Sequence, residues 1–153
     1  MFEAYLVRLV LGPLFLISLL VIVRLKRRKA GRLLMVIGVL HILGGVVVGR
    51  AWLARIFHDG FFGEADSYLG HAPEHVRKEL AFWFLLWGVF AFLFGQLLAW
   101  MEGQGRRAPA FIGWELLIIN LVAAALIPKG GFWLVLIPAF LIIRDADKPV
   151  SEG

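Results

Sequence analysis

The sequence predicts an all-α membrane protein, a polytopic bundle of about five transmembrane helices made of an N-terminal anchor and a four-helix core. The first observation is composition: 61% of the 153 residues are hydrophobic and the mean hydropathy is +0.84, whereas an ordinary globular domain is about 45–50% apolar. The second is that basic residues cluster at the ends of apolar runs, as they do around membrane spans. The third is a helical spacing of small residues inside those runs, which lets helices pack closely in lipid.

Residues 1–30 are predicted to form an N-terminal transmembrane anchor and a basic cytoplasmic linker. The apolar run Leu9–Val23 comes first, and six of the 16 Lys and Arg residues follow it between Arg24 and Arg32. A secretory signal has its charges before the apolar run and a small-residue cleavage site after it. Here the charges follow the run and no such site is present, so we expect the anchor to stay uncleaved.

The second predicted span, residues 32–49, carries a glycine face. Gly38, His41 and Gly45 are three and four residues apart, so they share one side of a helix, and Gly45 and Gly49 form a small-xxx-small pair. The third predicted span, residues 80–101, has a matching stripe of small residues at helical spacing: Ala81, Gly88, Ala91, Gly95 and Ala99. We expect these two faces to pack against each other.

The four-helix core is predicted to occupy residues 31–145, with a polar outer loop at 50–78 and a polar C-terminal tail at 146–153. The fourth span runs from about residue 110 to residue 127. The last apolar stretch, residues 132–143, has only about a dozen residues, although a perpendicular crossing of ~30 Å needs about 20. It therefore either crosses with local thinning of the bilayer, which we favour, or forms a re-entrant half-helix.

Charge placement predicts a multi-pass protein of the cell membrane with its N-terminus outside and its C-terminus in the cytoplasm. The positive-inside rule places the basic segment 24–32 in the cytoplasm, and alternation then places the loop 50–78 outside. The expected partners are membrane lipids and either further copies of the chain, as a homo-oligomer, or a larger membrane complex. Nucleic acid is not an expected partner, because no basic helix carries interleaved stacking aromatics.

Four polar residues within the spans are the candidate ligand-binding residues: His41, Gln96, Glu115 and Asn120. Polar and ionisable groups inside a membrane are costly, so each is a candidate functional residue. At ~1.5 Å per residue, the four lie at similar depths in the cytoplasmic half. The functional interpretation is a buried His41–Glu115 pair that binds a polar head group or relays a proton. The alternative is an interhelical hydrogen bond from His41 to Gln96, Asn120 or a backbone carbonyl, worth about 0.6–2 kcal/mol.

Other chemistry is excluded or weakly supported. The chain has no cysteine, which excludes disulfides, thiolate metal sites and thiol catalysis. His71 and His75 have the spacing of two metal ligands on one helical face, but Pro73 suggests that the helix begins after His71. Ala72 also stands where the zinc-protease motif has glutamate. We therefore expect a solvated loop there, no catalytic residues and no cofactor.

Several segments of the sequence, read together, resemble a known family. They are GVLHILGG, HDGFF, ELAFWFLLWGVF and IPKGGFWLVLIPAFLII, within residues 31–144. The chain resembles a family of small, uncharacterised bacterial four-helix membrane proteins. The resemblance implies a four-helix core with His41 in its first helix, and it makes the N-terminal anchor an additional helix. It implies no known activity.

We therefore predict a small multi-pass membrane protein that is not an enzyme and that acts through lipid or membrane-protein partners, as a subunit or assembly factor. The reason is that the sequence contains no recognisable combination of catalytic residues. Two alternatives stay open. One is a binder or enzyme for a lipophilic small molecule at His41 and Glu115. The other is proton or ion transport, which requires a connected polar path.

Overall fold

The computed structural model describes residues 30–66 and 73–146. Its helices are α2 (Ala30–His58), α3 (Pro73–Gly103), α4 (Ala110–Leu126) and α5 (Phe132–Ala146). No strand occurs in these two ranges, so the all-α prediction is confirmed for this part of the chain. The predicted N-terminal anchor, most of the C-terminal tail and His71 lie outside the described residues.

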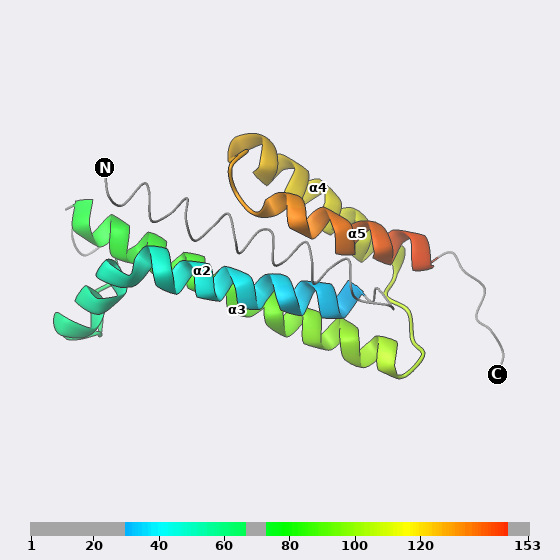
Figure 1. Cartoon of the computed structure of the whole chain (residues 1–153), viewed down its shortest axis with the longest axis horizontal. Helices are drawn as coiled ribbons and strands as arrows, with labels where there is room; N and C mark the ends of the chain where they lie inside the picture. The colour runs from blue at the N-terminus through cyan, green and yellow to red at the C-terminus, as the bar shows by residue number, and fades with distance from the viewer. Residues whose placement is uncertain (1–29, 67–72, 147–153) are drawn as a thin grey trace.

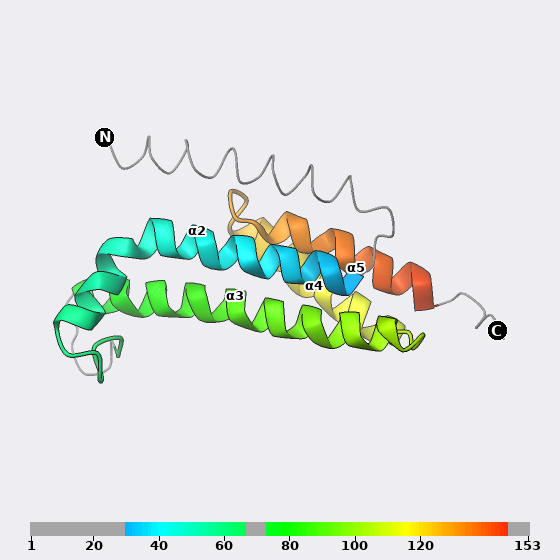
Figure 2. The ribbon, with the colours of Figure 1, turned by 60° about the horizontal axis from the view of Figure 1, so that its bottom comes forward.

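The four helices form two hairpins, α2 with α3 and α4 with α5 (Figure 1). The hairpins meet mainly through α5, which lies beside the half of α2 that begins at Ala30 (Figures 1 and 2). Buried side chains of α2, α3 and α5 form the core there: Leu33, Leu34, Ile37, Leu98, Val135, Leu141 and Ile142. Phe94 of α3 and Leu116 of α4 pack against both parts of this core, so all four helices contribute to it.

Helices α2 and α3 approach each other closely enough for backbone to exclude a Cβ atom at Gly31, Gly38 and Gly95. A Cβ built on Gly38 would lie 2.6 Å from the backbone nitrogen of Phe92, and a Cβ built on Gly95 would lie 2.5 Å from that of Met35. Real Cβ atoms essentially never come within 3.0 Å of such a neighbour. Glycine is therefore required where the two backbones touch, which is the close approach that small residues permit between helices.

Three further glycines of the predicted packing faces meet side chains of the partner helix. A Cβ on Gly45 would lie 2.7 Å from a methyl group of Leu85, and a Cβ on Gly88 would lie 2.8 Å from a side chain of α2. A Cβ on Gly49 would lie 3.4 Å from the Cβ of Ala81, which is ordinary van der Waals contact. The contact thus changes along the helices from backbone against backbone to side chain against backbone.

Helix α2 is longer than the predicted span. It continues through residues 50–58, which were predicted to lie in the outer loop. The physical reason is that no glycine or proline interrupts the chain between Gly49 and Gly60, where the backbone turns with φ +122°. Helix α3 begins at Pro73, as its sequence predicts. The outer connection is therefore shorter than the predicted loop 50–78.

Two of the described helices are long and apolar enough to cross a membrane, judged by length and composition. Their most apolar 18-residue stretches have mean hydropathies of 2.1 in α2 and 1.9 in α3. Helix α4 is apolar but has 17 residues, and α5 has 15 residues with Pro138 inside it. The described helices thus include two candidate spans, whereas the sequence predicts about five for the whole chain.

We predict that adding one methyl group at Gly38 destabilises the fold. In Gly38→Ala the new Cβ meets the backbone of Phe92, which cannot move unless α2 and α3 separate, and overpacking of this kind costs about 1–3 kcal/mol. The matched control is Gly44→Ala on the same helix, where nothing lies within 4 Å of the new Cβ. That change reduces the freedom of the unfolded chain and stabilises by about 0.4–1 kcal/mol. The free energy of unfolding of each purified variant measures both effects, and equal values would contradict the close approach.

Candidate functional site

His41 lies at the contact between α2 and α3 and is surrounded by aromatic rings. Its imidazole stacks on the ring of Phe84, with centroids 3.9 Å apart and planes 16° apart, and the ring of Trp87 lies 5.4 Å away. The Nε2 atom is buried and has no hydrogen-bond partner among the described residues. Leaving a buried polar atom unsatisfied costs about 1–3 kcal/mol. A molecule that reached Nε2 and offered it one hydrogen bond would remove that cost.

The structure does not bring the other three predicted residues to His41. Gln96 and Glu115 are exposed, and the backbones of α2 and α4 are not neighbours. Asn120 is 1% exposed, and its Nδ2 donates a hydrogen bond of 2.8 Å to the backbone carbonyl of Leu116, one turn earlier on the same helix. Residues at similar depths along the bundle therefore do not point toward one another, and the described structure contains no His41–Glu115 pair.

A buried lysine organises the outer connection, and the sequence pattern did not single it out. Lys78 of α3 is 2% exposed, and its Nζ donates hydrogen bonds of 2.7 Å to Asp59 Oδ2 and to Glu64 Oε2. Asp59 Oδ1 also lies 3.1 Å from Nδ1 of His58. The hydrogen bond from Lys78, followed by that from His58, holds the pKa of Asp59 below its ordinary value. One ammonium group thus ties two carboxylates of the connection to α3.

The spacing along α3 contains a signal that could have identified this lysine. Ala81 and Leu85 face glycines of α2. Lys78 precedes them by three and seven residues, which places it on the same side of the helix. A charged residue on a buried face needs oppositely charged partners. The connection that follows α2 contains two carboxylates that can be those partners, Asp59 and Glu64.

The same ion pairs support a turn that exposes aromatic side chains. Gly60, Phe61 and Gly63 all have positive φ angles, and the 70° at Phe61 is unusual for a residue with a side chain. Phe62 is 90% exposed, and the rings of Phe57 and Phe61 stack with centroids 5.4 Å apart. An apolar cavity of about 330 Å³ lies beside the turn. Backbone strain of about 1–3 kcal/mol therefore accompanies the exposure of these apolar rings.

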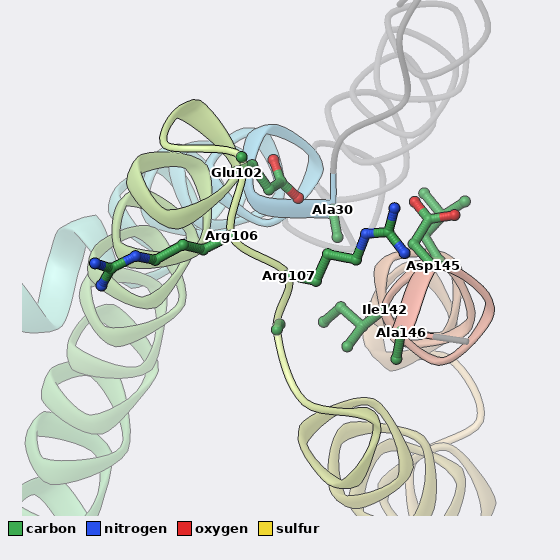
Figure 3. Close-up of a pocket in the computed structure, with 10 residues that line it drawn as sticks. Ala30, Glu102, Arg106, Arg107, Ile142, Asp145 and Ala146 are labelled. Carbon is green, nitrogen blue, oxygen red and sulfur yellow. The ribbon is translucent and has the colours of Figure 1, made fainter. Parts of the chain in front are cut away.

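A second cavity, of about 260 Å³, lies at the opposite end of the α2–α3 hairpin (Figure 3). It is bounded by the start of α2, the end of α3, the α3–α4 connection and the end of α5. Its walls combine apolar and charged side chains, among them Ala108, Leu141, Ile142, Glu102, Arg107 and Asp145. We call it the junction cavity, because both hairpins contribute to it.

The charged residues of the junction cavity have distinct orientations. Glu102 Oε1 accepts a hydrogen bond of 3.2 Å from the backbone N–H of Gly31, so it caps the first turn of α2. In Figure 3 the side chain of Arg107 extends toward Asp145, whereas that of Arg106 points away from the cavity. No motif in the sequence predicts this cavity. Its only signal is a pair of adjacent arginines directly after a helix end.

No group of three metal-ligating side chains occurs in the part of the chain that the structure describes. The His71–His75 hypothesis stays untested, because His71 lies outside those residues. His75 is on the first turn of α3, and its Nδ1 atom is buried without a hydrogen-bond partner among the described residues.

We predict that Lys78→Met releases the outer connection, because Asp59 and Glu64 then repel each other without the ammonium between them. Limited proteolysis should cut within residues 59–66 faster than in the wild type. Arg77→Met, which removes a charge from the neighbouring exposed position, should leave the rate unchanged. Because the pKa of Asp59 is lowered, its contribution is present above the ordinary aspartate pKa of roughly 3.9 and is lost as pH falls through the lowered value. Wild-type protection should therefore be constant above about pH 5. Equal cutting of the two variants at neutral pH would contradict this role for Lys78.

Compared with known protein families, the chain matches the one described as "Family of unknown function (DUF6463)" over residues 25–149. The match begins after the apolar run Leu9–Val23 and includes all four described helices. No curated protein matches the chain, and no solved structure matches it. The family description assigns no activity, which agrees with the uncharacterised family that the sequence resembles. Because the match covers well over half of its 153 residues, the chain belongs to the DUF6463 family of unknown function.

Proposed function

We propose that this chain is a multi-pass membrane protein that acts without catalysis, through lipid and membrane-protein partners, as a subunit or assembly factor. One observation carries the proposal. The most apolar stretch of α3 has a mean hydropathy of 1.9, yet only 17% of it is buried within the protein. The core helix of a water-soluble domain that is this apolar would be mostly buried. An apolar helix with an exposed apolar surface needs surroundings other than water.

The sizes of the side chains support the same conclusion. Glycine and alanine provide the closest approaches of the α2–α3 contact, and most large apolar side chains of α3 are exposed. The exposed ones are Val76, Leu80, Phe82, Trp83, Phe84, Trp87, Val89, Phe90, Leu93, Leu97 and Trp100. Removing each such side chain from water is worth roughly 1.5–3 kcal/mol. Exposed apolar patches beyond a few hundred Å² mark membrane or protein contacts. Small residues inside and large apolar residues outside are typical of helices packed in lipid.

The proposed topology has five crossings, with the N-terminus outside and the C-terminus in the cytoplasm. The charge asymmetry comes from the basic segment 24–32, which holds six of the 16 Lys and Arg residues and supports a cytoplasmic position for the chain that leads into α2. The opposite end of the α2–α3 hairpin also has basic residues, but they are fewer: Arg50, Arg55, Arg77 and Lys78. Helices α4 and α5, with 17 and 15 residues, are roughly 25 and 22 Å long at ~1.5 Å per residue. Each is shorter than a hydrocarbon core of ~30 Å, so their crossing requires local thinning.

A second candidate function is the binding of a lipophilic small molecule at His41. The observation that favours it is the buried Nε2 atom, which has no hydrogen-bond partner among the described residues, on an imidazole that contacts the rings of Phe84 and Trp87. Glu115 is exposed on α4 and takes no part in this version of the site. Native mass spectrometry of the chain released from its membrane separates the two candidates. A small mass that His41→Phe abolishes supports the second, and lipid or protein partners that are indifferent to His41 support the first.

We predict that a charge in the middle of the exposed face of α3 prevents stable membrane insertion. Phe90 is 60% exposed, so Phe90→Lys in water would change stability by less than about 0.5 kcal/mol. In the middle of a membrane span, lysine costs about 2.5–3.5 kcal/mol. Extraction of isolated membranes with alkaline carbonate should leave the wild type in the pellet and should release or deplete Phe90→Lys.

The matched control for this prediction is Gln104→Lys, which adds the same charge to the exposed α3–α4 connection. It should behave as the wild type does. Complete extraction of the wild type by carbonate, together with normal yield of Phe90→Lys as a soluble protein, would contradict membrane insertion.

A further inference from the structure

We propose that the turn after α2 inserts its phenylalanine rings into the outer leaflet of the membrane, where lipid surrounds them. The rings are those of Phe57, Phe61 and Phe62, and we call residues 57–64 the aromatic turn. This inference rests on the proposed membrane function and adds to it a lipid-binding surface outside the spanning helices. The experiment below distinguishes its failure from the failure of the proposed function.

The rings of the aromatic turn form one surface with the exposed face of α3. The ring of Phe61 stacks on that of Phe57, and its centroid lies 5.5 Å from that of Phe62. Phe61 and Phe62 also line the apolar cavity of about 330 Å³ together with Phe82 of α3. Phe82 is exposed, as is its neighbour Trp83, whose ring centroid lies 5.7 Å from that of Phe82. Lipid that covers this face of α3 would therefore also reach the aromatic turn.

Ion pairs hold the rings beside α3. The last turns of α2 bend across the beginning of α3 (Figure 2). There the buried ammonium group of Lys78 donates hydrogen bonds to the carboxylates of Asp59 and Glu64, which precede and follow the phenylalanine pair in the sequence. Both carboxylates are thereby turned toward Lys78, whereas Phe62 remains 90% exposed. The aromatic turn thus directs its carboxylates inward and its phenylalanine rings outward.

The depth of the aromatic turn matches the outer end of the apolar spans. Phe82, at the cavity, directly follows Ala81, which faces Gly49 of α2. Gly49 is the last residue of the second predicted span. The rings beside Phe82 therefore lie near the boundary between hydrocarbon and head groups in the proposed topology. Apolar side chains such as phenylalanine insert ~5–10 Å into that layer.

Basic residues next to the aromatic turn complement the phosphate groups of that boundary. The guanidinium carbons of Arg55 and Arg77 lie 5.5 and 5.4 Å from the ring centroid of Trp52, and both arginines are exposed. Arg55 also pairs with Glu74, whereas Arg77 has no carboxylate partner in the described part of the chain. Tryptophan beside basic side chains at the end of a span is typical of the head-group region. The charge near the rings therefore suits a lipid surface.

The size of the aromatic turn favours lipid over a protein partner docked on the turn alone. A buried phenylalanine removes about 150–250 Å² from water. Three rings that are 53–90% exposed therefore offer on the order of 400 Å². A stable protein interface takes about 800 Å² from each partner. Insertion into a bilayer has no such threshold, because its strength rises with the apolar area that enters the lipid.

The test measures the depth of single nitroxide labels in the full-length protein. The chain has no cysteine, so Phe62→Cys, Phe90→Cys and Gln104→Cys each carry one label after reconstitution into vesicles of phosphatidylcholine and phosphatidylglycerol. Electron paramagnetic resonance compares collisions of the label with oxygen, which concentrates in hydrocarbon, and with a water-soluble nickel chelate. The oxygen-to-nickel ratio at Phe62→Cys should be severalfold higher than at Gln104→Cys, in the exposed α3–α4 connection. It should be lower than at Phe90→Cys, in the middle of α3.

Equal ratios at Phe62→Cys and Gln104→Cys would overturn the insertion of the aromatic turn. Phe57→Cys, a second exposed position, should also exceed Gln104→Cys and keeps the test decisive if the label at residue 62 disturbs the turn. Spin–spin broadening that persists when the protein is diluted with lipid would show a second copy at the turn and overturn lipid as its occupant. If Phe90→Cys reports hydrocarbon while both turn positions report water, this inference fails and the proposed function stands. If Phe90→Cys also reports water, the proposed membrane insertion fails as well.

Discussion

The backbone contact between α2 and α3 is the constraint on which the rest of the structure depends. It extends from Gly31 against Ala99 at one end to Gly49 against Ala81 at the other. Because no Cβ fits at Gly38 or Gly95, the space between the helices is filled by main chain. Most of the large apolar side chains of α3 then lie on its outer surface, while Leu98 and Phe94 pack into the core. The glycine contact and the apolar exterior are thus two sides of the same helix.

Polar contacts from α3 close both ends of this helix pair. At one end Glu102 accepts the N–H of Gly31, which is otherwise an unsatisfied donor of the first turn of α2. At the other end Lys78 donates to Asp59 and Glu64, just beyond the last turn of α2. Between the two ends the contact contains apolar and aromatic groups, with His41 as its ionisable residue. The polar contacts of the helix pair therefore lie at its two ends, and the middle is apolar apart from His41.

Much of the fold could be predicted from the sequence, because helical periodicity identifies which residues share a face. The glycine patterns correctly predict residues of the observed α2–α3 contact, at positions 38 and 45 in α2 and at positions 88 and 95 in α3. The end of α2 was misplaced, since apolar content falls after Gly49 although nothing breaks the helix before Gly60. Composition predicts where a span ends, and only backbone chemistry predicts where a helix ends.

The candidate sites were less predictable, because sequence gives the depth of a residue along a helix but neither its direction nor the identity of the neighbouring helix. His41 and Glu115 have similar predicted depths, yet α2 packs on α3 and α5 and not on α4. The contacts of Lys78 could not be predicted for a related reason. Its partners lie in the connection between α2 and α3, and helical periodicity does not predict the path of a connection. The junction cavity forms where two hairpins meet, which no single-helix pattern encodes.

The measurement that tests the central claim most directly is the formation of a disulfide between α2 and α3 in the full-length protein. The chain has no cysteine of its own, and a Cβ on Gly49 would lie 3.4 Å from the Cβ of Ala81, close to the ~3.5–4.5 Å of a disulfide. In Gly49→Cys/Ala81→Cys, mild oxidation should keep the two halves joined after proteolytic cleavage between α2 and α3, until reductant is added. Gly44→Cys/Ala81→Cys should not cross-link. If the first cross-link does not form, or if both form equally, the close packing of α2 on α3 is contradicted.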